Sequence, residues 1–191
     1  KVSNKDDSYA LLPLGKTFHI APSNVDTIFL YSSLIALICG NICLIRLSSQ
    51  RTEQINFAID KLNSVLSQHS NFLKRLFVFN YGHNDEITRR ISSHIDLRVI
   101  WGGDNSVKEI RSIPLNPMAR ELTFPNRFSF TVMKSKEVIS NQYDLNSIVD
   151  SFLKDTIYFD QQACSSPRSL IWLGSQNDNQ KAQDIFWKRY L

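Results

Sequence analysis

Short β-rich runs alternate along this chain with stretches of helical periodicity, and this alternation limits the possible folds more than any other feature. The runs, rich in β-branched and aromatic residues, lie at residues 17–21, 42–47, 76–81, 97–101, 128–133 and 169–173. Between them, apolar residues recur every three or four positions in residues 51–67, 85–95, 106–113 and 144–158. This order predicts an α/β fold in which helices cover both faces of a parallel sheet.

Several segments allow finer predictions. ICLI at residues 42–45 and LFVF at residues 76–79 are almost entirely apolar, which is typical of strands buried on both faces of a parallel sheet. Ser106 followed by Glu109 has the spacing of a capping box, so a helix is expected to begin there. Residues 25–39 form the longest apolar segment, which falls short of the ~20 residues of a membrane span and predicts a buried helix.

Composition and charge narrow the functional classes. With 191 residues, of which 42% are apolar, the chain can bury a sizeable core. The net charge is +4 and the pI about 9.0, but the basic residues are scattered rather than gathered in a stripe. This scatter favours a solvated surface over a nucleic-acid interface. A nucleic-acid-binding domain remains the alternative that would explain the basic pI.

The cysteines and histidines point to a reducing compartment and to no metal site. Three cysteines without a signal peptide predict a cytoplasmic protein without a disulfide framework. Cys39 and Cys43 lie in LICGNICLI, where apolar neighbours predict packing in the core. The four histidines lack metal-ligand spacing, so each is expected to be a surface or a satisfied core residue. The chain begins with Lys1 rather than Met, and we therefore expect a piece of a longer protein.

Cys164 stands in a different setting, within FDQQACSSPRSLIWL. Small polar residues surround it, and the apolar run Leu170–Leu173 follows. A cysteine that only packs would be expected inside that run, whereas a thiol in a polar turn before a strand is a candidate nucleophile. From the residues alone, a structural or incidental cysteine remains the alternative.

The junctions that follow the predicted strands are the places to look for a ligand, because parallel sheets bind ligands beyond the carboxyl ends of their strands. Gly102 and Gly103 follow one strand and could let the backbone approach a phosphate at a helix N-terminus. A simple turn is the alternative, because the full G-x-G-x-x-G pattern is absent and Asp104 would repel a close phosphate.

Taken in order, APSNVD, GNICLIRLSS, VIWGGDNSVKEIR and FDQQACSSPRSL resemble the acyl-CoA reductases of the LuxC type, distant members of the aldehyde dehydrogenase superfamily. The resemblance extends over about residues 15–175. It implies a Rossmann-like nucleotide-binding domain at residues 1–135 and the beginning of the catalytic domain at residues 136–191. It also implies that the parent protein is a homo-oligomer and that this piece alone is inactive.

The activity implied by the resemblance is the NADPH-dependent reduction of a long-chain acyl-CoA, or another acyl thioester, to a fatty aldehyde. Cys164 matches the nucleophile that carries the acyl group, and Asn24 matches the asparagine that stabilises the oxyanion. For Asn24, a helix N-cap is the structural alternative. An acyl-transferring or acyl-activating protein is a further expected partner. A non-catalytic nucleotide-binding or scaffold module is the alternative function.

Departures from the superfamily pattern refine the expected cofactor and chemistry. NAD-using aldehyde dehydrogenases carry Lys-Pro-Ser-Glu where this chain has RLSS at residues 46–49, and the missing carboxylate predicts NADPH over NADH. Aldehyde-oxidising members also carry a glutamate that activates water, and NRFSFTVMKS has none, which fits reduction. The cofactor-binding residues that the resemblance implies are Pro22, Arg46, Ser48, Ser49, Gly102 and Gly103.

Overall fold

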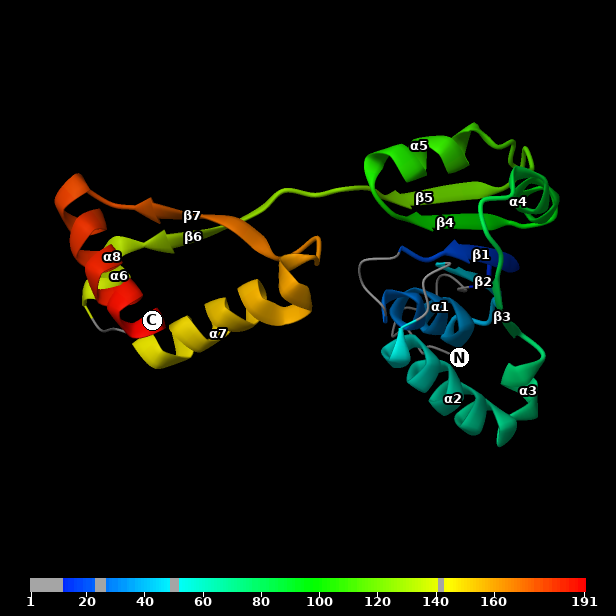
Figure 1. Ribbon diagram of the computed structural model, residues 1–191, viewed down its shortest axis with the longest axis horizontal. Coiled ribbons are helices and arrows are strands. Elements are labelled where there is room, and N and C mark those ends of the chain that lie inside the picture. Colours follow the sequence, from blue (N-terminus) through cyan, green and yellow to red (C-terminus); the bar gives the residue numbers. More distant parts are fainter. Residues whose placement is uncertain (1–11, 23–26, 49–51, 141–142) are drawn as a thin grey trace, which may run out of the picture. The chain divides into compact units, whose positions relative to one another are not determined.

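The computed structural model describes residues 12–22, 27–48, 52–140 and 143–191 (Figure 1). The chain divides into two compact units, Lys1–Asn126 and Arg127–Leu191. This division lies before the boundary near residue 135 that the resemblance implies.

The first unit is built on a five-stranded parallel sheet with the order β3-β2-β1-β4-β5. From β1 the chain adds β2 and β3 on one side and then crosses over to add β4 and β5 on the other. The order therefore reverses between β1 and β4, as in Rossmann-like folds. The strands are β1 Lys16–Ile20, β2 Ile42–Leu47, β3 Leu76–Asn80, β4 Leu97–Trp101 and β5 Arg120–Phe124.

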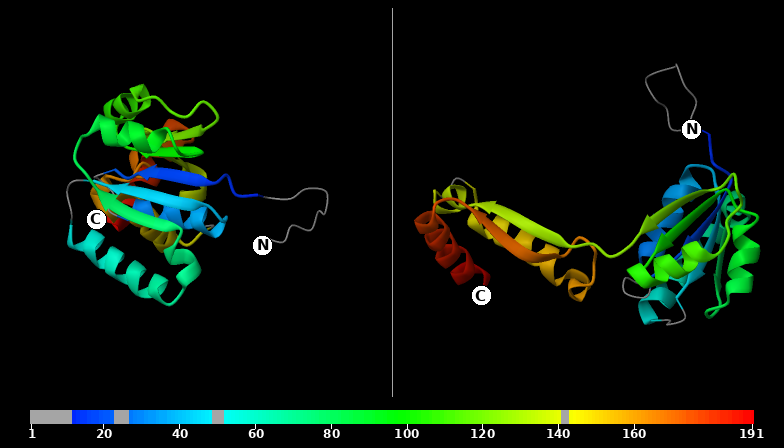
Figure 2. Two further views of the ribbon diagram at one scale, coloured as in Figure 1. Left: turned by 90° about the vertical axis from the view of Figure 1, so that its right-hand side faces the viewer. Right: turned by 90° about the horizontal axis from the view of Figure 1, so that it is seen from above.

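Helices cover both faces of this sheet (Figure 2), which confirms the predicted α/β class. α1 and α2 pack on one face, where Phe29 and Leu62 meet Ile45. α4 and α5 pack on the other face, where Val107 meets Phe18. The helices are α1 Ile28–Ile38, α2 Glu53–Ser67, α3 Ser70–Leu73, α4 Asp85–Ser92 and α5 Asp104–Ser112.

Burial on both faces applies to the middle of the sheet but not to its edges. β1 and β4 are buried along most of their length, and β2 alternates buried with half-buried residues. β3 is an edge strand in which Phe77 is 48% exposed, so the prediction of full burial for LFVF was wrong. Periodicity missed the other edge strand, β5, because Arg120 and Glu121 give its sequence RELTF little apolar character.

Two predictions about helices need correction. α1 forms within the long apolar segment, but Tyr31, Ile35 and Ile38 are exposed, so only one face of the helix is buried. α5 begins at Asp104 with Gly103 as its N-cap, so Ser106 and Glu109 lie inside the helix and form no capping box at its start. Among the described residues, no helix is both long and apolar enough to cross a membrane.

The prediction of core packing was right for one of the two neighbouring cysteines. Cys43 on β2 is fully buried, and its thiol donates to the carbonyl oxygen of Ser33 at 3.4 Å. Cys39 is exposed, because it caps the C-terminus of α1 rather than facing the sheet.

A buried ion pair joins β4 to the edge strand β5. Arg98 is 1% exposed, and its guanidinium donates to the carboxylate of Glu121, with Nε 2.6 Å from Oε2. It also donates to the hydroxyl of Ser92 and the carbonyl of Ile113, both at 3.1 Å. Across the described parts of the chain, every buried side-chain nitrogen and oxygen has a hydrogen-bond partner.

The second unit is a two-stranded parallel sheet with helices on one face. Phe152 of α7 and Phe186 of α8 pack with Trp172 of the sheet. On the outer face, Ile171 and Leu173 are exposed, so the run Leu170–Leu173 alternates rather than being buried throughout. The elements are β6 Ser129–Lys134, α6 Ser135–Ile139, α7 Leu145–Ile157, the 3-10 helix η1 Tyr158–Gln161, β7 Pro167–Leu173 and α8 Gln176–Tyr190.

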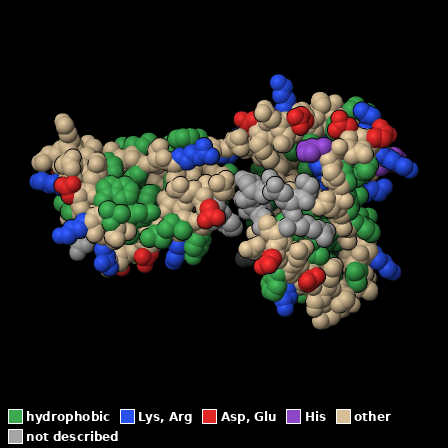
Figure 3. All heavy atoms as spheres, viewed as in Figure 1, with side chains coloured by type: hydrophobic (Ala, Val, Ile, Leu, Met, Phe, Trp, Pro, Cys, Tyr) green, Lys and Arg blue, Asp and Glu red, His purple; other side chains and the backbone are tan. Residues whose placement is uncertain are grey.

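Basic side chains do not gather in a stripe on the face of the molecule drawn in Figure 3, where blue and red side chains are interspersed.

Candidate nucleotide-binding site and nucleophile

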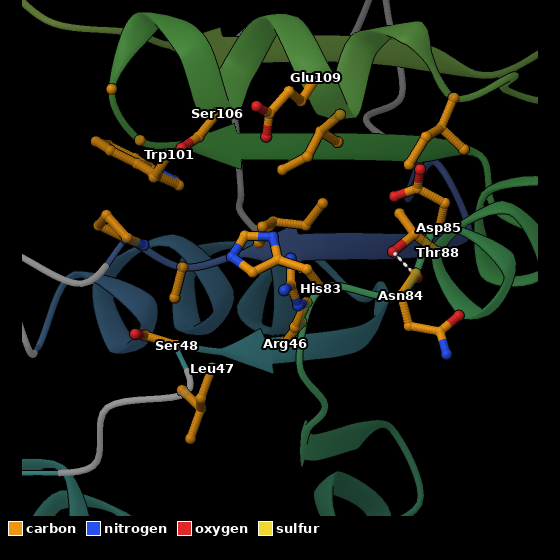
Figure 4. A pocket seen from close by; sticks show the side chains of 17 residues that line it. Arg46, Leu47, Ser48, His83, Asn84, Asp85, Thr88, Trp101, Ser106 and Glu109 are labelled. Atoms are coloured by element: carbon orange, nitrogen blue, oxygen red, sulfur yellow. Dashed lines mark hydrogen bonds between the residues drawn. The ribbon is translucent and has the colours of Figure 1, made fainter.

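A cavity of about 390 Å³ lies across the carboxyl ends of β1, β2 and β4, beside α4 and α5 (Figure 4). This is the point at which the strand order reverses. The structure brings together here most of the residues that the sequence assigned to the cofactor, namely Pro22, Arg46, Ser48, Gly102 and Gly103. Ser49 and the proposed oxyanion residue Asn24 lie outside the described residues.

Arg46, at the end of β2, is held against the loop that follows β3. Its Nε–H donates to the carbonyl of Tyr81 at 3.4 Å, and Nη2 donates to that of Gly82 at 3.3 Å. The guanidinium lies over the Tyr81 ring, 4.6 Å from its centre. A guanidinium has five N–H donors, more than these two contacts use, so Arg46 can also bind an anion in the cavity.

The support beneath Arg46 is itself fixed. The Tyr81 hydroxyl lies 2.9 Å from the hydroxyl of Thr88 on α4. Burial raises the pKa of Tyr81, so its phenol stays neutral beneath the guanidinium at physiological pH.

Gly102 and Gly103 form the turn between β4 and α5. Gly103 has φ −65°, which any residue can adopt, and a Cβ on Gly102 would come no closer than 3.5 Å to Ser106. The turn itself therefore does not require either glycine, and what they provide is open backbone beside the cavity. Asp104 accepts the backbone N–H of Asn126 at 3.0 Å and is not among the described residues that line the cavity.

Among the cavity residues that the sequence did not indicate, three have ionisable side chains: His83, Asp85 and Glu109. His83 and Asp85 come from the segment around the start of α4, and Glu109 comes from α5. In Figure 4 the His83 ring points into the middle of the cavity. The loop sequence NYGHND held the only hint, because it follows a predicted strand.

A chain of polar side chains leads from the sheet interior to the cavity. His19, on β1, is 2% exposed, and its ring nitrogens lie 2.7 Å from the Ser32 hydroxyl and 2.9 Å from the Thr17 hydroxyl. The indole N–H of Trp101, which lines the cavity, donates to the same Ser32 hydroxyl at 3.3 Å. His19 is thus a satisfied core histidine, as predicted.

His19 should make the stability of the first unit depend on pH. Burial lowers its pKa from 6.5 to about 4, so between these values the unfolded chain binds a proton that the folded chain does not. Lowering the pH from 6.5 to 4 should therefore remove about 3 kcal/mol of unfolding free energy. Urea unfolding across this range measures the loss, and a His19→Asn variant should lack this component. If the unfolding free energies of the unmodified protein and of His19→Asn fall equally as the pH is lowered, the expectation is wrong.

Cys164 lies in the second unit and is exposed, in the turn between η1 and β7. The Ser129 hydroxyl donates to the Cys164 carbonyl at 2.6 Å, and the Ser166 N–H donates to that of Ala163 at 3.0 Å. Just before the turn, Asp160 and Gln161 have φ of 51° and 59°. Such left-handed backbone is unfavourable for residues other than glycine and is concentrated at functional sites.

Comparison with known proteins places these features in a family. Residues 2–184 match the sequence model of the family described as acyl-CoA reductase (LuxC). The chain belongs to this family.

Two curated relatives of this LuxC-family chain are long-chain acyl-protein thioester reductases. The protein of Photorhabdus laumondii is 28% identical over 181 residues, covering 93% of this chain and 36% of the relative. The protein of Aliivibrio fischeri is 26% identical over 183 residues, covering 92% of this chain and 36% of the relative. The chain thus spans little more than a third of the length of these relatives.

The LuxC-family chain also has the fold of aldehyde dehydrogenases. The structure of PnpE from Pseudomonas sp. WBC-3 in complex with nicotinamide adenine dinucleotide matches with a TM-score of 0.67 and 17% identity. The match covers 94% of this chain and 34% of PnpE.

Proposed function

We propose that this chain is the nucleotide-binding part, and the nucleophile-bearing start of the catalytic part, of a longer cytoplasmic reductase. That protein uses NADPH to convert a long-chain acyl thioester, such as acyl-CoA or an acyl-protein, into a fatty aldehyde. The observation that carries the proposal is the convergence of Pro22, Arg46, Ser48, Gly102 and Gly103 on one cavity where the strand order reverses. Ligands of open α/β sheets bind at this position.

The residues of the cavity fit a phosphorylated dinucleotide. Arg46 and Ser48 at the end of β2 would hold the 2′-phosphate, since residues 46–49 contain no carboxylate to repel it. The open backbone of Gly102 and Gly103, at the N-terminus of α5, would hold the pyrophosphate. Glu109 on α5 can accept hydrogen bonds from a ribose hydroxyl. When bound, NADPH supplies the hydride for the reduction.

Cys164 would carry the acyl group. Its thiolate attacks the thioester carbonyl, a Cys164–acyl bond forms, and the thiolate of CoA or of the acyl-protein leaves. After hydride addition at the carbonyl carbon, the C–S bond breaks, the aldehyde departs and the Cys164 thiolate is regenerated. Ser129 supports this role by holding the Cys164 carbonyl, which orients the turn.

Cofactor choice tests the assignment of Arg46. Arg46→Glu should weaken NADPH binding about 10- to 100-fold, because a charge-assisted contact is lost and a carboxylate repels the phosphate. NADH binding should change little or improve. Isothermal titration calorimetry with both nucleotides measures the effect, and Arg75→Glu, whose guanidinium stacks on Phe72, is the matched charge-reversal control. Equal affinities of the unmodified protein for NADPH and NADH would count against this assignment.

The activity itself is tested in the full-length protein. Incubation with NADPH and acyl-CoA of several chain lengths should produce matching losses of NADPH absorbance and gains of fatty aldehyde. A scaffold module would bind nucleotide without forming aldehyde, and a nucleic-acid-binding protein would instead show steeply salt-dependent binding to DNA or RNA.

A further inference from the structure

The hydrogen bonds that connect Thr17, His19, Ser32 and Trp101 each have a defined donor and acceptor. An indole N–H can only donate, so the Ser32 oxygen accepts from Trp101 and the Ser32 hydroxyl proton is directed elsewhere. At the other end, the Thr17 hydroxyl donates to the carbonyl of Ile42 at 3.2 Å, so its oxygen accepts from His19 Nε2–H. His19 Nδ1 then has no proton and accepts the hydroxyl of Ser32. Each donor in this series of side chains therefore has one acceptor.

At the cavity, the series of hydrogen-bonded side chains ends at Trp101. It is the last residue of β4, directly before Gly102, and its ring stacks on Phe124 with centroids 3.8 Å apart and planes 9° from parallel. The stack holds the plane of the indole, and the hydrogen bond to Ser32 holds its rotation within that plane. Both constraints act on the same cavity wall.

We propose that His19 is a positioning residue for the cofactor: through Ser32 it fixes Trp101, which forms a rigid aromatic wall of the nucleotide cavity. The inference rests on the proposed function, because it requires the cofactor to occupy this cavity. His19 is not among the described residues that line the cavity, and the hydrogen bonds through Ser32 connect its ring to Trp101, which does line it. Its buried, neutral ring suits this role, because it keeps Nδ1 available as an acceptor.

Two variants of His19 separate the proposal from a purely structural role. In His19→Asn the amide oxygen takes the place of Nδ1 and still accepts from Ser32. In His19→Gln the longer amide takes the place of Nε2 and keeps only the contact with Thr17. In the full-length protein, the Gln variant should raise the Kd for NADPH about three- to tenfold, whereas the Asn variant should stay within about twofold of the unmodified protein.

A double-mutant cycle tests whether the effect passes through Trp101. Trp101→Phe keeps an aromatic ring beside Phe124 but cannot donate to Ser32, and it should weaken NADPH binding by a similar factor. His19→Gln should then add nothing in the Trp101→Phe background. Independent, multiplicative effects would overturn the proposal, as would equal weakening by the Asn and Gln variants. If a His19 variant fails to fold by circular dichroism, Ser32→Ala on α1 interrupts the same chain and takes its place in the cycle.

The same titrations distinguish this inference from the proposed function. If the unmodified protein binds NADPH and Arg46→Glu weakens binding while His19→Gln does not, only the role of His19 is wrong. If the unmodified protein shows no NADPH binding, or Arg46→Glu has no effect, the cofactor assignment of the cavity is wrong. The NADPH-induced change in tryptophan fluorescence should also shrink in Trp101→Phe, which reports contact with Trp101 directly.

Discussion

Cys164→Ser should reduce acyl-enzyme formation and aldehyde release by the full-length protein about 10³-fold or more. A serine hydroxyl stays protonated near neutral pH, whereas a thiol provides a thiolate, which is the attacking species. Mass spectrometry of the intact protein after exposure to a long-chain acyl-CoA measures acylation, and aldehyde is measured in the same samples. NADPH affinity should stay within about twofold, because Cys164 is not among the described residues that line the cavity.

The other two cysteines are the controls. Cys39 is exposed, as Cys164 is, and Cys39→Ser should leave acylation and stability nearly unchanged. Cys43 is fully buried, so Cys43→Ser should lower the stability of the protein. Burial also raises the pKa of the Cys43 thiol, which makes it a poor nucleophile, so acylation should persist in this variant. Aldehyde production by the Cys164→Ser protein, or an acyl group found on another residue, would refute the proposed mechanism.

Glu121→Ala should destabilise the first unit by about 3–5 kcal/mol. Glu121 is the carboxylate partner of Arg98, and without it a guanidinium that is 1% exposed keeps only neutral acceptors. Arg111 also contacts Glu121, at 3.0 Å, but its side chain is 62% exposed and can be solvated after the change. Urea denaturation monitored by circular dichroism measures the difference.

A second ion pair in the same unit supplies the control. Glu86 pairs with Arg89 at 2.8 Å, and both side chains are largely exposed, so Glu86→Ala should change stability by less than about 0.5 kcal/mol. Arg98→Met combined with Glu121→Leu should recover much of the loss, because it removes the buried charge together with its partner. If Glu121→Ala costs no more than Glu86→Ala, the buried charge does not determine the stability of this strand pair.

Local sequence predicted the secondary structure correctly where neighbouring residues share the same preference for strand or helix. The bounds of β2 and β4, Ile42–Leu47 and Leu97–Trp101, agree with the predictions, because both are short runs of β-branched and apolar residues. α2 was predicted from its regular apolar stripe, and the structure adds that Thr52 caps its start.

The predictions failed where a distant partner decides the structure. Glu121 lowers the apolar character of β5, and only its pairing with Arg98 on β4 explains a carboxylate there. α8 has just two buried residues, Ala182 and Phe186, so its polar sequence concealed a helix that packs through aromatic contacts. α5 begins at Asp104 rather than at the predicted Ser106, because the end of β4 already fixes where the chain must turn.

The amino-acid sequence by itself determined the fold class and the family, because short motifs and periodicity are properties of neighbouring residues. The residues assigned to the cofactor remain a proposal. The tertiary structure alone decided that β1 and β4 are neighbours, and so that the ends of β1, β2 and β4 meet at one cavity. It also placed His83 and Glu109 in that cavity and connected His19 to Trp101. These contacts join residues far apart in the chain, and crossover connections and side-chain packing set them in ways that local preference does not encode.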